Sequence, residues 1–371
     1  MVFNRISCEI FNLDEWLGVS GFLHEPTNRE QLGNGERIIQ NDYRIIDLNC
    51  LYLSNKEIRA MTLIEFTHQY PDEASCKASF RATRESEGIT CRRCNSTAHY
   101  WKKDKECFEC KKCKSRTSLR SGTVMEKSQL PFRYWLLAIH LMTSTKKSIS
   151  ALEMQRQLGH KFYEPIWEMM HKIRSMMGKR DSNYILDDTI EVDEGFFTQV
   201  KTGEKGEKKE EREQQKRGRG AQNKAKVLVM TSTEPVEMYN KHQKPSKLKF
   251  IKMTVLQDLK ADMIEAQIKE MISPDATVKT DGFKSYSNLK YIVAKHSQQV
   301  VAPKEAGVVF PWVHTMISNA KRTFAGIHHM MKTDYIQNYL DEFCYKVNRR
   351  YFQDKLFDRL LIACVAGSWY D

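Results

Sequence analysis

The chain has 371 residues, 41% of them hydrophobic and 29% charged, which is typical of a globular protein long enough for two or three domains. No apolar run approaches the roughly 20 residues that cross a bilayer, and the first residues lack the basic and apolar segments of a secretory signal, so the sequence argues against a membrane or secreted protein. The formal net charge of +12 favours a polyanionic partner.

The first sixty residues show neither a helical face nor a pair of strands. Gly33, Asn34 and Gly35 interrupt any periodicity there, and a helical pattern first appears at Met61. We therefore treat residues 1–60 as an N-terminal extension that is either loosely attached or without a role.

Five of the ten cysteines fall between Cys91 and Cys113. They include two CxxC pairs separated by fifteen residues, which is the spacing of a zinc ribbon and favours metal ligation over a disulfide framework. We expect such a ribbon over residues 61–120, with one structural Zn²⁺ held by Cys91, Cys94, Cys110 and Cys113. Cys107 is expected on a strand as a small apolar residue. The alternative is a set of unligated surface thiols, which proteins usually avoid.

Basic residues flank both cysteine pairs. Arg92 and Arg93 lie inside the first pair, and Lys111 and Lys112 lie inside the second. They predict a face that binds DNA phosphates, although a merely solvated face fits the same residues.

Residues 121–184 carry a helical pattern. One helix begins with a capping pattern at Ser150 and ends at Gly159, and a second follows after a short turn. Such a pair is typical of a helix-turn-helix and is also common in ordinary bundles. Beside a basic ribbon it becomes a candidate DNA reader, with Lys172 and Arg174 as candidate DNA-binding residues.

Two apolar strands, far apart in the sequence, each lead to an aspartate. β-Branched residues favour an extended backbone over 189–192, before Asp193, and over 276–280, before Asp281. Carboxylates where strand ends converge are the ligands that hard divalent cations take. The alternative is a pair of solvated turn residues, because Asp-Gly is also a turn signal. The two strands together predict a divalent-metal site.

The region from residue 185 to residue 371 mixes strands and helices. Three strands, a helix and a further strand suit an α/β layer with a mixed central sheet. Residues 203–224 form a charged, low-complexity loop that we expect to be disordered when free. Its basic end, with Lys216, Arg217 and Arg219, is expected to bind DNA phosphates.

Several motifs, taken in their order along the chain, indicate a resemblance to a known family. They are the two CxxC pairs, Thr117–Glu126, Ile149–Gln155, His171–Arg174, Glu191–Glu194, Thr280–Gly282, Val313–Asn319, Tyr339–Phe343 and Asn348–Arg350. From about residue 61 to about residue 352, the chain resembles the DDE-type transposases of bacterial insertion sequences, in the zinc-ribbon group related to the eukaryotic Merlin superfamily.

The resemblance implies an RNase H-like catalytic domain with a mixed central sheet over residues 185–371, preceded by the zinc ribbon and a helix-turn-helix-like domain. Asp193 and Asp281 correspond to the first two catalytic acids, which hold two Mg²⁺ or Mn²⁺ ions. Asn319 stands where relatives carry the third acid, and its carbonyl oxygen is a neutral ligand. Lys321 is the candidate for the basic residue that follows. His314 would position a phosphate or transfer a proton, unless it is a core histidine.

The function that the resemblance implies is that of a transposase, which binds the ends of its insertion sequence and catalyses metal-dependent DNA cleavage and strand transfer. Because Asn319 removes a charged ligand, the alternative is a decayed or repurposed transposase that still binds DNA through its zinc ribbon. The implied partners are double-stranded DNA, as terminal repeats and target, and further copies of the chain in a homodimer or higher oligomer. The implied location is the cytoplasm of a bacterium, at the nucleoid.

Overall fold

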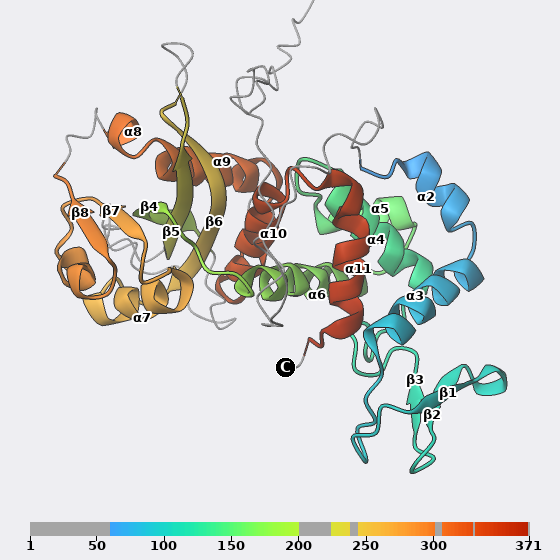
Figure 1. Cartoon of the computed structure of the whole chain (residues 1–371). Coiled ribbons are helices and arrows are strands. Elements are labelled where there is room, and N and C mark those ends of the chain that lie inside the picture. The colour runs from blue at the N-terminus through green and yellow to red at the C-terminus, as the bar shows by residue number, and fades with distance from the viewer. Residues whose placement is uncertain (1–59, 200–223, 238–243, 301–305, 329–330, 370–371) are drawn as a thin grey trace, which may run out of the picture. The chain divides into compact units, whose positions relative to one another are not determined.

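The computed structural model describes residues 60–199, 224–237, 244–300, 306–328 and 331–369 (Figure 1). Residues 1–59 of the predicted extension and residues 203–223 of the predicted loop, with Lys216, Arg217 and Arg219, lie outside these ranges. Residues 58–235 and 248–371 form one compact unit. In the described part of the chain, no helix is long and apolar enough to span a membrane.

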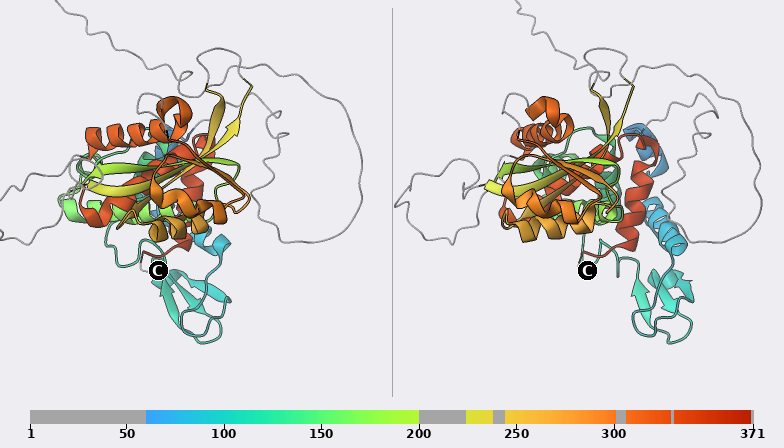
Figure 2. Two further views of the ribbon diagram at one scale, coloured as in Figure 1. Left: turned by 90° about the vertical axis from the view of Figure 1, so that its left-hand side faces the viewer. Right: turned by 60° about the vertical axis from the view of Figure 1, so that its left-hand side comes forward.

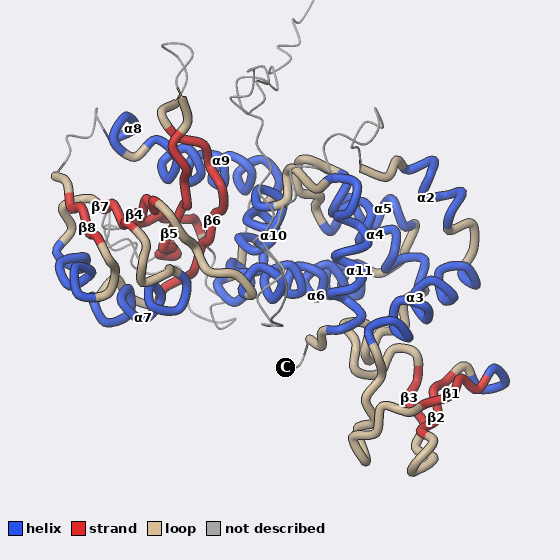
Figure 3. The backbone as a smooth tube through the Cα atoms, in the orientation of Figure 1, coloured by secondary structure: helices blue, strands red, loops and turns tan. Residues whose placement is uncertain are grey.

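The helices and strands fall into three regions along the chain (Figure 3). The N-terminal region contains α2 Leu63–Gln69, α3 Glu73–Glu87, β1 His99–Lys102, the 3₁₀ helix η2 Lys103–Lys105, β2 Cys107–Cys110 and β3 Arg116–Ser118. The middle region contains α4 Phe132–Ser144, α5 Ala151–Leu158 and α6 Tyr163–Ser182. The C-terminal region contains β4 Thr189–Thr198, β5 Lys224–Pro235, β6 Ser246–Leu256, α7 Ala261–Met271, β7 Thr277–Thr280, η4 Lys284–Tyr291, β8 Lys295–Gln298, α8 Ala306–Val309, α9 Pro311–Ile327, η5 Thr333–Tyr335, α10 Ile336–Asn348, η6 Gln353–Lys355 and α11 Leu356–Ala366.

The C-terminal region is built on a five-stranded sheet with the order β6-β5-β4-β7-β8. The central strand β4 pairs antiparallel with β5 and parallel with β7, and β7 pairs parallel with β8. Helix α9 covers one face of the sheet and α7 covers the other (Figure 2). This mixed sheet between helices confirms the predicted α/β, RNase H-like fold.

The two faces of β4 have different surroundings. Ile190 and Val192 pack into the core that contains α7, whereas Phe197 packs into the core that contains α9. Because successive side chains of a strand point to opposite faces, Glu191 and Asp193 lie on the α9 face. The strand therefore buries apolar residues on one side and directs acids toward one helix on the other.

A separate antiparallel sheet, β1-β2-β3, forms the predicted ribbon. The guanidinium of Arg84 on α3 donates a hydrogen bond to the carbonyl of Ser118 at 2.9 Å and lies 5.7 Å from the Phe108 ring. These contacts fasten the ribbon to α3. Cys107 is buried on β2, as predicted.

The predicted helical pair is present as α5 and α6. The hydroxyl of Ser150 accepts a hydrogen bond from the N–H of Glu153 at 3.1 Å, and Gly159 ends α5 with a φ of +63°. That positive φ favours glycine, because a side chain would be strained there. The C-terminal helix α11 packs in the same core as α3, α4 and α6 and not on the sheet, so the two ends of the described chain share one hydrophobic core.

Candidate active site and metal centre

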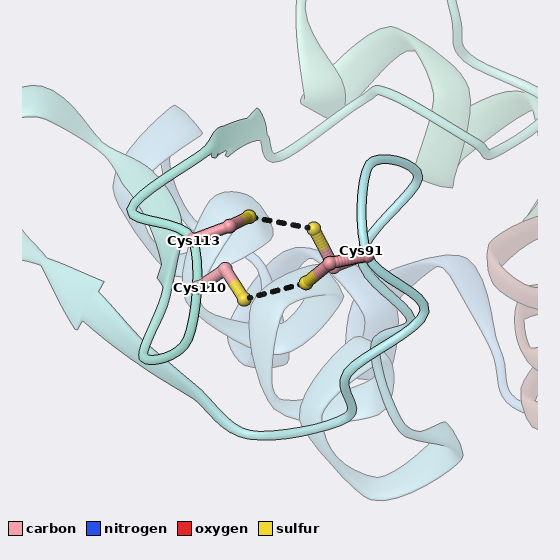
Figure 4. Close-up of side chains that lie close together, drawn as sticks. Cys91, Cys110 and Cys113 are labelled. Atoms are coloured by element: carbon pink, nitrogen blue, oxygen red, sulfur yellow. Dashed lines mark hydrogen bonds between the residues drawn. The ribbon is translucent and has the colours of Figure 1, made fainter.

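The four predicted zinc ligands come together at the tip of the ribbon. The Sγ atoms of Cys91 and Cys113 are 3.5 Å apart, and those of Cys94 and Cys110 are 3.6 Å apart (Figure 4). All four sulfurs lie within 4.8 Å of one another. Four thiolates bound tetrahedrally at Zn–S distances of 2.3 Å would be about 3.8 Å apart. The cluster therefore has the size that a zinc ion requires.

Two turns of the same shape place these thiols. The N–H of Asn95 donates to the carbonyl of Cys91 at 2.9 Å, and the N–H of Lys114 donates to the carbonyl of Cys110 at 3.0 Å. Asn95 and Lys114 both have left-handed backbones, with φ of 54° and 60°. Each CxxC pair is thus followed by a tight turn that folds its two cysteines toward the other pair.

The same turns act on the charge state of the thiols. Backbone N–H groups lower the pKa of Cys91 and lower the pKa of Cys110 to about 6. For Cys94, the N–H of Ser96 also lowers the pKa, but burial and the neighbouring thiols outweigh it and raise the pKa to about 12. The turns therefore favour thiolates at Cys91 and Cys110, and the thiolate is the form that binds zinc.

The basic residues predicted around the ribbon are at the surface. Arg93, Lys111 and Lys112 are exposed. Arg92 is also exposed, but its guanidinium forms two hydrogen bonds with the carboxylate of Glu126, at 2.7 and 3.1 Å. Three of the four predicted cations are therefore presented to solvent without such a partner carboxylate.

Lys172 and Arg174, in contrast, are not on a DNA-facing surface, and that prediction was wrong. They are 2% and 1% exposed, respectively. Lys172 Nζ lies 2.8 Å from a carboxylate oxygen of Glu168, and Arg174 Nε lies 2.7 Å from one of Glu342 on α10. The middle of α6 is enclosed by other helices, where Arg174 neutralises the buried Glu342 and Lys172 pairs with the exposed Glu168 one turn earlier on the same helix.

Asp193 on β4 and Asp281, the residue directly after β7, lie at the same level of the sheet. In the parallel pairing of β4 with β7, Val192 is opposite Thr280, so the two aspartates occupy the next positions. Asp193 Oδ1 accepts a hydrogen bond from the N–H of Glu194 at 2.8 Å, and Asp281 Oδ1 accepts one from the N–H of Phe283 at 2.9 Å. Both side chains are half-buried. Asp281 therefore accepts a hydrogen bond within a turn and also lies at the level of Asp193 in the sheet.

Helix α9 brings His314 to this pair. His314 Nδ1 lies 3.4 Å from Asp193 Oδ2. Burial lowers the pKa of His314, and the negative charge of Asp281 opposes that shift. The imidazole at this position is accordingly neutral near pH 7, where it can accept or donate one proton.

Lys321 follows His314 by seven residues, close to two helical turns, and so lies on the same side of α9. Its Nζ is 5.9 Å from the centre of the Phe197 ring on β4. Burial and the charge of Lys224 lower the pKa of Lys321, and the charge of Asp193 raises it. Lys321 thus adds a cation to the face that carries the aspartates.

Asn319 is placed differently. It follows His314 by five residues, which turns it by about 140° around the axis of an α-helix. Its Oδ1 accepts a hydrogen bond from Arg322 Nη2 at 2.6 Å. The structure brings His314 to Asp193, with Lys321 on the same side of α9, whereas Asn319 lies on another side of that helix. The role of Asn319 as a third ligand stays a prediction.

One acid of this face, Glu191, was not a candidate in the sequence. It precedes Asp193 by two residues and so shares its face of β4, which was the available signal. Its side chain is only 4% exposed. A buried carboxylate two residues from a proposed catalytic acid requires a partner of its own.

The two candidate metal sites differ in how complete they are. In the ribbon, four potential ligand atoms, the Sγ atoms of the cysteines, lie within 4.8 Å of one another. Within the described residues, no other histidines, cysteines or acids form a group of three or more that is as close. The aspartates and His314 do not form such a cage. Two carboxylates nevertheless fit Mg²⁺, which usually binds one or two carboxylates together with water and substrate phosphates.

Comparisons with known proteins agree with this fold and motif set. Residues 185–348 match the family model described as an ISXO2-like transposase domain. Over 189 residues, the chain is 25% identical to a protein described as "Uncharacterized protein in transposable element ISH50" from Halobacterium salinarum (strain ATCC 700922 / JCM 11081 / NRC-1). That match covers 49% of this chain and 57% of the relative.

Among solved structures, the chain is similar to one entitled "Crystal structure of the Mos1 Strand Transfer Complex", at 10% identity and a TM-score of 0.25. The match covers 65% of this chain and 81% of that one. The match of residues 185–348 to an ISXO2-like transposase domain, together with the relative from a transposable element, confirms the predicted resemblance of the chain to insertion-sequence transposases.

Proposed function

We propose that the protein binds the ends of its insertion sequence and catalyses metal-dependent DNA cleavage and strand transfer, with Asp193 and Asp281 as metal ligands. One observation carries the proposal. Within a segment that matches a transposase domain, two aspartates from distant parts of the sequence lie level on adjacent parallel strands. Such a pair of carboxylates suits divalent cations that assist transfer at phosphorus.

The roles of the side chains follow from their positions. Asp193 and Asp281 would hold Mg²⁺ or Mn²⁺ together with DNA phosphates, and two such ions activate the attacking hydroxyl and stabilise the leaving oxygen when bound. His314, neutral and beside Asp193, can take a proton or position a phosphate. Lys321 can neutralise phosphate charge near the same face.

Recognition of DNA is assigned to the ribbon. Zinc held by its four cysteines would order the turns that carry Arg93, Lys111 and Lys112, and these exposed cations suit the phosphate backbone. Cutting both ends of an element and joining them to a target calls for at least two catalytic sites. We therefore propose that the protein acts as a dimer or a larger assembly on DNA.

A second candidate function is favoured by Asn319. Its side chain is uncharged and accepts a hydrogen bond from Arg322, so the chain offers fewer charged ligands than a site with three acids. A protein that binds element ends without cutting them is consistent with that feature. The aspartate pair with His314 and Lys321 favours the enzyme.

The test uses the full-length, zinc-loaded protein and DNA fragments that carry the terminal repeats of the element. With Mg²⁺ or Mn²⁺, we expect nicks at the repeat ends and joined products, and neither with chelator or with scrambled ends. Asp193→Asn and Asp281→Asn should cut at least about a thousandfold more slowly, because each removes a charged ligand. Both variants should still bind the ends.

Two outcomes would reject parts of the proposal. Tight binding of the ends without cutting in either metal would establish the DNA-binding alternative. Cutting at the parental rate by Asp193→Asn would place the catalytic site elsewhere.

A further inference from the structure

The buried acid Glu191 is bound to the beginning of helix α9. Its Oε2 accepts hydrogen bonds from the N–H groups of Trp312 and Val313, each at 2.9 Å. Glu191 is the third residue of the central strand, and α9 begins 120 residues later, at Pro311. A single carboxylate thus joins the strand to the first turn of the helix.

This contact has a clear physical reason. The first N–H groups of a helix have no partner within the helix and carry a partial positive charge. Pro311 has no N–H, and the residue before it, Phe310, supplies no side-chain cap. A carboxylate from another element is therefore the cap of α9. Hydrogen bonds from N–H groups to an ionised acceptor are stronger than neutral ones, which compensates for burying the charge.

The cap also fixes the geometry of the active site. Glu191 and Asp193 lie on the same face of β4, and His314 directly follows the two capped residues on α9. The bond between strand and helix at Glu191 therefore determines the position of His314, whose Nδ1 lies 3.4 Å from Asp193 Oδ2. A rotation or shift of the first turn of α9 would separate these two groups.

We propose that Glu191 is a positioning residue, which holds the N-terminus of α9 on β4 so that His314 lies against Asp193. The inference rests on the proposed function only where it predicts how Glu191 affects DNA cleavage. Glu191 is not assigned as a metal ligand, because its side chain is buried and its Oε2 is directed at the helix.

The first test compares Glu191→Ala with Glu191→Gln. The alanine variant removes the cap, whereas the glutamine oxygen can accept the same two N–H groups without the charge. Glu194→Gln is the matched control, because Glu194 is a buried acid on the opposite face of the same strand. Hydrogen exchange of peptides that contain residues 311–320, measured by mass spectrometry, reports the cap directly.

We expect Glu191→Ala to speed this exchange at least about tenfold, Glu191→Gln to restore much of the protection, and Glu194→Gln to leave α9 unchanged. The DNA cleavage rate at saturating DNA should fall at least about tenfold in Glu191→Ala, while affinity for the ends stays within about twofold. Recovery of the rate in Glu191→Gln would support positioning by the cap.

A second measurement does not depend on cleavage. The imidazole NMR signals of His314, assigned with a His314→Gln variant, should shift in Glu191→Ala and not in Glu194→Gln. If neither these signals nor the exchange of α9 changes in Glu191→Ala, the proposal is overturned, whatever the activity of the parent protein.

If exchange rises but the His314 signals stay fixed, Glu191 caps the helix without positioning His314, and this result also overturns the proposal. If the parent does not cut DNA while both physical signals respond, the proposed function fails and the positioning inference stands.

Discussion

The ribbon and the aspartate site are both candidate metal sites, and they are built in opposite ways. Four thiols from two short motifs lie within 4.8 Å of one another before any metal is considered. The aspartates come from two strands and face a helix from a third part of the chain, and they do not form a closed cage.

This difference matches the two tasks. A structural zinc site has four protein ligands and contributes directly to folding. Here all four ligands come from two short motifs of one small ribbon. A site for Mg²⁺ in phosphoryl transfer keeps positions for water and substrate phosphates, so the protein supplies only part of the shell. The ribbon should therefore depend on its metal for structure, whereas the aspartate site should depend on its metal only for chemistry.

The largest expected effect is the loss of zinc. Structural zinc contributes about 10–16 kcal/mol to the folding of small zinc domains. Cys91→Ser or Cys110→Ser should lose about one zinc per chain and expose the ribbon to proteases, whereas Cys107→Ser should keep both properties. Metal analysis with limited proteolysis measures this. Equal zinc loss for Cys107→Ser, or none for Cys110→Ser, would contradict the ligand assignment.

A smaller effect is expected at the contact that joins α6 to α10. Burial by itself raises the pKa of Glu342, but the charges of Arg174 and Lys346 outweigh it and lower the pKa to about 2. Glu342→Gln leaves two buried cations without their anion, which should reduce the free energy of unfolding at pH 7 by about 3–5 kcal/mol.

The sign of the pH dependence follows from that shift. A carboxylate with a lowered pKa in the folded state stabilises the protein above its unfolded pKa and loses this contribution as pH falls. The difference between the parent and Glu342→Gln should thus be largest above about pH 4.5 and shrink toward pH 2. Urea unfolding at pH 7 and at pH 3.5 tests this, and a difference that grows on acidification would be incompatible with the ion pairs.

The exposed lysines of the ribbon should affect binding and not stability. Replacing Lys111 and Lys112 together by alanine should weaken binding of end DNA about tenfold near physiological salt and reduce the salt slope by about two, because two phosphate contacts are lost. The free energy of unfolding should change by less than about 0.5 kcal/mol. Lys269→Ala, an exposed lysine on α7, is the control. Equal weakening in the control would show that only net charge matters.

The smallest effect is expected at Asn319. Since Asn319 lies on another side of α9 than His314 and its carbonyl oxygen binds Arg322, Asn319→Ala should change the DNA cleavage rate by no more than about threefold, and Asn319→Asp should not raise it. Cleavage assays with Mg²⁺ and with Mn²⁺ measure both variants. A loss of a hundredfold or more in Asn319→Ala would support the assignment made from the family pattern.

The sequence was most informative where structure is local. The CxxC spacing predicted the cluster of four cysteines, and Ser150 and Gly159 predicted the ends of α5, because caps and tight turns involve neighbouring residues. The strand residues beside Asp193 and Asp281 predicted that both acids lie at a sheet. That these strands are neighbours in register depends on the fold and could not be read from spacing.

The predictions that were wrong or missed concern contacts between distant residues. Arg174 looks like a surface cation until α10 supplies Glu342, 168 positions later in the sequence. Glu191 looks like an ordinary strand acid until α9 presents two N–H groups to it. In both cases the charge of the partner decides the role, and that partner is not marked by any local pattern.

Binding of Mn²⁺ to the zinc-loaded protein in the presence of end DNA, followed by electron paramagnetic resonance, tests the central claim most directly. The parent should bind Mn²⁺ beyond what DNA alone binds. Asp193→Asn and Asp281→Asn should each lose most of this binding while keeping one zinc per chain and their affinity for the ends. Parental Mn²⁺ binding in both variants would contradict a catalytic metal site at these aspartates.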